Sequence, residues 1–152
     1  MNTKEELSLI SSADGIDHIA YATKNTERTS NVFSEFGFRR VIYKREITQF
    51  NIFATKLQNS AGDVIELIQP SDQTMYSPVD TFLKNNDCTI YHVCYKVDDF
   101  YDVLKRLKSL GAVSATKPFD SYLFDGYISS HLYHPLVGLF EIFGSCKRKQ
   151  SC

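Results

Sequence analysis

Two copies of one sequence pattern, 74 to 75 residues apart, limit what this chain can fold into. Residues 15–25 are rich in β-branched and aromatic side chains and contain His18, and residues 89–99 repeat that stretch around His92. The two histidines are 74 positions apart. Because such stretches favour β-strands, the sequence predicts that each copy opens with a strand that carries a histidine.

The segments that follow each histidine repeat as well. A helical pattern ends at Gly37 in the first copy and at Gly111 in the second, again 74 positions apart. An apolar strand pattern then surrounds Glu66 in the first copy and Glu141 in the second, 75 positions apart. These correspondences predict an internal duplication in which the second copy has gained one residue. Each module then carries one histidine and one glutamate on its strands.

Each copy predicts one strand, one helix and three further strands, in the order βαβββ. In the first copy the strands are residues 16–22, 38–47, 50–58 and 64–68, and the helix is residues 26–36. In the second copy the strands are residues 91–97, 114–117, 126–133 and 139–143, and the helix is residues 100–110. We therefore expect one domain over residues 15–143, with modules at 15–70 and 89–143. A connector at 71–88 holds a short helix at 79–84, a polar lead occupies 1–14, and a disordered tail occupies 144–152.

The overall composition limits which partners and which cellular location we expect. The formal net charge of -1 over 152 residues gives no reason to expect nucleic acid or an anionic membrane as a partner. The longest apolar runs fall well short of the roughly 20 residues of a membrane span, and the N-terminus does not resemble a signal peptide. We expect a cytoplasmic protein. Its four cysteines form no CxxC pair, which argues against a disulfide framework or a structural zinc site.

A glutamate inside each of two apolar strands needs an explanation, because charged side chains are rarely buried without a partner. If the modules pair by pseudo-twofold symmetry, His18 and Glu66 from one meet His92 and Glu141 from the other. Two carboxylates neutralise a divalent cation, and the cation removes the cost of burying them. We expect these four residues to hold one divalent ion, and Co, Ni, Mn and Zn all suit two nitrogen and two oxygen donors. The alternative is a His–Glu hydrogen-bond network without a metal.

Two further histidines are weaker candidates for metal ligands. His131 stands in the strand pattern of residues 126–133 and could face either side of the sheet. His134 stands in a turn that contains proline and glycine, and we expect it to face solvent. We expect neither histidine to bind the ion.

With these positions in place, the chain resembles the vicinal oxygen chelate superfamily, whose members are built from paired βαβββ modules. The resemblance covers residues 15–143. The family's metal ligands occupy the opening and final strands of each module, where this chain has His18, Glu66, His92 and Glu141. The resemblance implies an α+β fold in which the two modules form an incompletely closed eight-stranded barrel. It also implies a homodimer.

Several segments resemble methylmalonyl-CoA epimerases and their close relatives within that superfamily: residues 16–20, 66–70, 77–78, 82–86 and 134–135. This resemblance implies a divalent-metal-dependent isomerase that removes a proton alpha to the carbonyl of a small-molecule substrate, an acyl thioester. Glyoxalase I proteins share the same four ligands, so a lactoylglutathione lyase is the first alternative. The second alternative is a non-catalytic small-molecule binding or resistance protein, although such proteins generally lack the metal ligands.

The resemblance also implies which residues move the proton. An epimerase removes the proton from one face of the α-carbon and returns it to the other, which calls for two bases. Glu141 is the first base by resemblance. Glu46 is the candidate for the second, because epimerases carry a glutamate near that position. Glu66 is the alternative second base, and in a glyoxalase-type reaction Glu66 and Glu141 would act across the substrate as base and acid.

Overall fold

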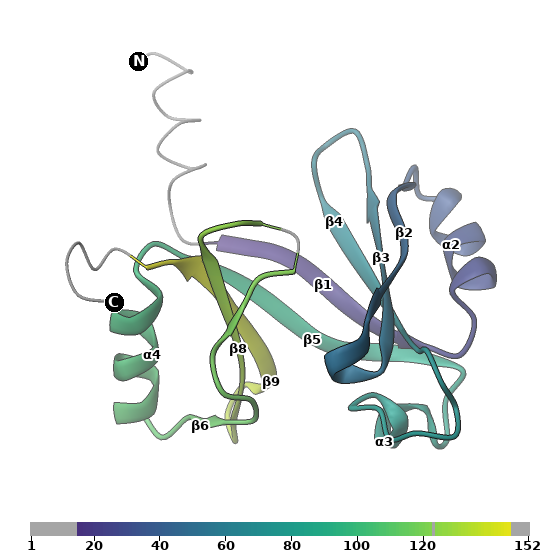
Figure 1. Ribbon diagram of the computed structural model, residues 1–152. Helices are drawn as coiled ribbons and strands as arrows, with labels where there is room; N and C mark the ends of the chain where they lie inside the picture. The colour runs from purple at the N-terminus through teal and green to yellow at the C-terminus, as the bar shows by residue number, and fades with distance from the viewer. Residues whose placement is uncertain (1–14, 123, 147–152) are drawn as a thin grey trace, which may run out of the picture. The chain divides into compact units, whose positions relative to one another are not determined.

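The computed structural model of the chain describes residues 15–122 and 124–146 (Figure 1). The described residues fall into two compact units: one is residues 18–92, and the other combines residues 15–17 with residues 93–122 and 124–146. The expected lead at 1–14 and most of the expected tail, residues 147–152, lie outside the described residues. The boundary between the units falls inside two strands rather than in the connector between the two sequence copies.

The unit of residues 18–92 contains four strands and two helices. The strands are β1 (Gly15–Thr23), β2 (Arg39–Ile47), β3 (Ile52–Gln58) and β4 (Val64–Pro70), and the helices are α2 (Thr26–Ser34) and α3 (Asp80–Leu83). The strand order is β2–β3–β4–β1. Strand β1 runs parallel to β4, whereas β2 and β4 run antiparallel to β3.

Helix α2 covers one face of this sheet, and that face is apolar (Figure 1). The buried and partly buried residues of this core are Leu57, Ile65, Leu67, Ile19, Tyr21, Phe33 and Phe38. The Gln69 side-chain oxygen accepts hydrogen bonds from the backbone N–H and the hydroxyl of Thr26, both at 2.9 Å, and so ties the start of α2 to β4. Because side chains alternate along a strand, His18 and Glu66 face the other side of the sheet.

Strand β3 begins two residues later than the sequence predicts, because the chain first makes a 3-10 turn, η1 (Thr48–Phe50). Asn51 ends that turn in the left-handed region with φ of 52°, a conformation that asparagine tolerates better than most residues. Its side-chain amide donates to the carbonyls of Asp72, Met75 and Tyr76 at 2.8 to 3.2 Å. The turn therefore fixes the start of the connector to this unit.

The second unit contains the other sheet and its helix. Its strands are β5 (Cys88–Val97, which starts in the first unit), β6 (Val113–Ser114), β7 (Phe119–Asp120), β8 (Tyr127–His134) and β9 (Gly138–Ser145), and its helix is α4 (Phe100–Ser109). Strand β9 pairs in parallel with β5 and antiparallel with β8, and β6 and β7 both pair with β8. None of the helices in the described part of the chain is long and apolar enough to cross a membrane.

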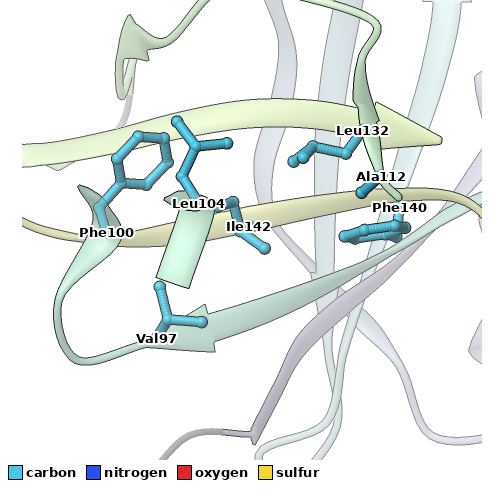
Figure 2. Packing of buried hydrophobic residues seen from close by; sticks show 7 residues of the cluster. All are labelled: Val97, Phe100, Leu104, Ala112, Leu132, Phe140 and Ile142. Carbon is cyan, nitrogen blue, oxygen red and sulfur yellow. The ribbon is translucent and has the colours of Figure 1, made fainter. Parts of the chain in front are cut away.

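The core of this second unit lies between α4 and the strands. Figure 2 shows its buried side chains gathered there: Val97, Phe100, Leu104, Ala112, Leu132, Phe140 and Ile142. Phe100 and Leu104 come from α4, one turn apart on the helix, so they present one apolar face to the sheet. The Asp99 side chain accepts a hydrogen bond from the backbone N–H of Asp102 at 3.2 Å and caps the start of that helix.

The α+β class and the two βαβββ modules are confirmed, but one expected strand is wrong. Two short strands, β6 and β7, replace the strand predicted at 114–117, so the described residues hold nine strands rather than eight. The N–H groups of Ala115 and Thr116 both donate to the His131 carbonyl, at 2.8 and 3.2 Å. Two residues therefore oppose one, which interrupts the strand pairing, and Pro118, two residues after Thr116, has no N–H to resume it.

Candidate metal centre

His18 and Glu66 lie beside each other on neighbouring strands of the first unit. The parallel register of β1 and β4 places Ala20 next to Glu66, so His18, two residues earlier, faces the same side of the sheet. His18 is 5% exposed, and its Nε2 lies 2.8 Å from a carboxylate oxygen of Glu66. The histidine and the glutamate of the first sequence copy are thus brought together.

His92 joins these two residues from β5. Its side chain is 2% exposed, and its ring centroid lies 5.7 Å from the ring centroid of His18, in an edge-on arrangement. One donor atom from each of His18, Glu66 and His92 lies within 4.8 Å of the others. Two imidazole nitrogens from buried histidines and one oxygen from the partly buried Glu66 carboxylate, at this spacing, suit a divalent ion such as Co, Ni, Mn or Zn. An ion there would also offset the cost of burying the Glu66 carboxylate.

Glu141 lies on β9 in the second unit, where it is 8% exposed. The register of β8 and β9 places His131 directly opposite it, and His131 Nε2 is 4.0 Å from a Glu141 carboxylate oxygen. Directly opposed residues share a face, so His131 faces the same side as Glu141, a point that the sequence left open. The His131 ring also stacks on Phe119, with ring centroids 5.7 Å apart.

His134 has a structural place in the turn before β9. Its Nδ1 accepts a hydrogen bond from the backbone N–H of Leu136 at 3.1 Å, which leaves Nε2 to donate to the Leu110 carbonyl at 3.0 Å. The side chain is half-buried rather than fully solvent-facing, because it links this turn to the end of α4. Both ring nitrogens serve the fold.

The strand register separates Glu46 from the face that carries His18 and Glu66. Glu46 is exposed on β2 and pairs with Phe53 of β3, which in turn pairs with Gln69 of β4. Because cross-strand partners share a face, Glu46 projects on the side of Gln69 and α2, opposite to the side of Glu66. The structure therefore does not bring the expected second base to the histidine–glutamate cluster.

Lys56 is a candidate site residue that the sequence patterns did not single out. It lies on β3 directly opposite Glu66, shares the face of that glutamate, and is 8% exposed. The second copy has the same arrangement, with His131 directly opposite Glu141. In each copy the basic residue stands ten positions before the glutamate. That spacing was visible in the sequence, but the two residues differ in type, and a lysine in a strand is ordinarily expected to face solvent.

Comparison with known families relates most of this chain to one superfamily. Residues 17–127 match the family model described as Glyoxalase/Bleomycin resistance protein/Dioxygenase superfamily. The matched range includes His18, Glu66 and His92, whereas Glu141 lies beyond its end. No curated protein sequence matches the chain significantly.

Solved structures share the fold at low sequence identity. A hypothetical protein from Bacillus halodurans is 17% identical, with a TM-score of 0.71 over 91% of this chain and 99% of that one. Methylmalonyl-CoA epimerase from Mycobacterium tuberculosis is 18% identical, with a TM-score of 0.72 over 88% of this chain and 89% of that one. A glutamate-to-glutamine variant of the Streptomyces coelicolor methylmalonyl-CoA epimerase, in complex with 2-nitronate-propionyl-CoA, is 20% identical, with a TM-score of 0.70 over 86% and 96% of the two chains.

At these identities the solved structures show a shared fold, whereas the match to the family model covers well over half of the sequence. The order of strands and helices in this chain agrees with that match. So does the presence of a histidine and a glutamate on the strands of each module. The chain therefore belongs to the glyoxalase/bleomycin resistance protein/dioxygenase superfamily.

Proposed function

We propose that this protein is a divalent-metal-dependent isomerase that removes a proton alpha to the carbonyl of an acyl thioester, in the manner of a methylmalonyl-CoA epimerase. The observation that carries the proposal is the cluster of the buried His18 and His92 with the partly buried Glu66. The fold supports it, because the chain shares that fold with several methylmalonyl-CoA epimerases, one of them in complex with methylmalonyl-CoA. The proposed substrate is a thioester of coenzyme A or of a carrier protein.

Glu141 is the fourth metal ligand in this proposal, and the strand registers of the two copies support that role. In the first copy, Glu66 pairs with the residue two positions after His18. In the second copy, Glu141 pairs with the residue two positions after His92. Each glutamate therefore stands in the same relation to the histidine-bearing strand of its own copy. Equivalent positions in a duplicated chain favour equivalent roles.

A bound divalent ion would supply Lewis-acid stabilisation of the negative charge that develops on the substrate carbonyl. His18 and His92 would hold the ion through ring nitrogens, and the carboxylates of Glu66 and Glu141 would balance its charge. Because the two histidines are 5% and 2% exposed, little bulk water reaches their donor atoms. Electrostatic interactions at such a site are stronger than at the surface.

Glu141 and Glu66 are also the two bases in this proposal. Epimerisation removes the proton from one face of the α-carbon and delivers a proton to the opposite face, so one carboxylate is needed on each side. Glu46 projects from the α2 side of its sheet, so the register of β2 favours Glu66 over Glu46 as the second base.

Hydrogen exchange at the α-carbon tests this function. We expect the metal-loaded protein in D2O to exchange the α-proton of methylmalonyl-CoA and to interconvert its two stereoisomers, as followed by NMR and chiral analysis. Removal of the ion with a chelator should abolish both activities. The hemithioacetal of methylglyoxal and glutathione, assayed in parallel, should not be isomerised. Isomerisation of the hemithioacetal without exchange in the thioester would overturn the proposal in favour of a lyase, and inactivity of the metal-loaded protein on both substrates would overturn it too.

A further inference from the structure

Lys56 is the only lysine or arginine that is buried among the described residues, at 8% exposure. A buried ammonium group is costly unless it lies next to negative charge. On the same face of the sheet, Glu66 lies directly opposite it, and Ala54, two residues earlier on β3, is 2% exposed. A long cationic side chain therefore stands beside the candidate metal ligands, next to a small neighbour.

The charges of the proposed site suggest a role for Lys56 in binding an anion. A divalent ion held by Glu66 and Glu141 with two neutral histidines carries no net charge. Lys56, which faces Glu66 across the sheet, adds one positive charge beside this group. Such a site favours an anionic ligand over a neutral one of the same shape, because a positive site in a buried environment attracts negative charge strongly.

We propose that Lys56 binds a carboxylate of the substrate beside the metal ion and so selects malonyl-type acyl groups over neutral acyl groups. This inference rests on the proposed function, and it adds a residue that determines specificity. Lys56 shares the face of Glu66 on the neighbouring strand, where directly opposed residues on antiparallel strands have Cβ atoms about 5 Å apart. A charge-assisted hydrogen bond from the ammonium group to a carboxylate is stronger than a hydrogen bond between neutral groups.

A purely structural role for Lys56 makes a different prediction. If the lysine only holds Glu66 in position, its removal should weaken metal binding and have no separate effect on the affinity for anions. If it binds the substrate carboxylate, its removal should leave the metal in place and weaken only the binding of anions. Measurements of metal content and of anion affinity on the same proteins therefore separate the two roles.

The test uses malonate and its neutral amide counterpart, malonamide, as probes on the metal-loaded full chain. Wild type is compared with Lys56→Met, Lys56→Arg and a control, Lys105→Met, which removes one charge from an exposed position on α4. Metal content is measured by mass spectrometry after dialysis, and binding by titration calorimetry. We expect Lys56→Met to keep its metal but to bind malonate roughly tenfold to a hundredfold more weakly. Lys56→Arg and Lys105→Met should stay within a few-fold of wild type, and malonamide binding should be the same in all four proteins.

Three outcomes would overturn the inference without overturning the proposed function. The first is unchanged malonate affinity in metal-loaded Lys56→Met. The second is loss of metal from that variant, which would make Lys56 a positioning residue for Glu66. The third is a metal-loaded wild type that exchanges the α-proton of methylmalonyl-CoA but does not prefer malonate to malonamide, which would leave the proposed function standing. A wild type that binds no metal would overturn the proposed function and this inference together.

Discussion

The His92→Ala protein is expected to lose its divalent ion and, with it, roughly 10³-fold or more of its α-proton exchange activity. His92 supplies one of the two ring nitrogens in the candidate site, and β5 carries no other histidine that could replace it. Removal of a ligand leaves the ion held by fewer donors, so dialysis should strip it. Metal content by mass spectrometry and exchange in D2O measure the two losses.

A matched histidine control makes this result specific. His134→Ala removes an imidazole whose two nitrogens bond to backbone groups of Leu136 and Leu110, outside the candidate site. That variant should keep its full metal content, although it loses stability because the turn loses two hydrogen bonds. Thermal unfolding of both variants shows whether they remain folded. Full metal content in a folded His92→Ala protein would contradict the assignment of His92 as a ligand.

Glu66→Gln and Glu141→Gln are expected to separate the two proton transfers. Each change keeps the shape of the side chain but removes the base, so epimerisation should fall by roughly 10²-fold or more. Exchange of the α-proton should survive for one stereoisomer only, and the surviving stereoisomer should differ between the two variants. The assays need excess metal and a check of metal content, because an amide is a weaker ligand than a carboxylate.

Glu46→Gln is the control for this pair of variants. Glu46 is exposed and projects on the α2 side of its sheet, so its variant should epimerise methylmalonyl-CoA at the wild-type rate. A 10²-fold slower epimerisation by Glu46→Gln, with unchanged metal content, would instead make Glu46 the second base. Exchange of both stereoisomers by both Glu66→Gln and Glu141→Gln would contradict the two-base account as a whole.

The repeat in the sequence was sufficient to predict most of the strands and to bring His18, Glu66 and His92 together. A histidine and a glutamate recurring in register identify positions that matter, and the parallel pairing of β1 with β4 follows from the βαβββ order. The position of Glu46 could not be predicted in the same way. Its face depends on the register of β2 with β3, which shifts near Lys44, where the backbone adopts a φ of 44°. A shift of one residue reverses the face of every later side chain.

Two other features depend on contacts that one sequence does not display. The strand expected at 114–117 is interrupted because the His131 carbonyl accepts from two successive N–H groups, which depends on where β8 lies. Lys56 was missed because its burial depends on its cross-strand neighbour rather than on its own strand pattern. A search for basic residues at a fixed distance before each glutamate would have found Lys56 together with His131.

Anomalous X-ray scattering from crystals of the metal-loaded protein tests the central claim most directly. The account predicts one anomalous peak, with donor atoms of His18, Glu66, His92 and Glu141 at about 2.0–2.3 Å from it. A peak surrounded by other residues, or a bound ion from which the Glu141 side chain points away, would contradict the four-ligand site on which the proposed chemistry depends.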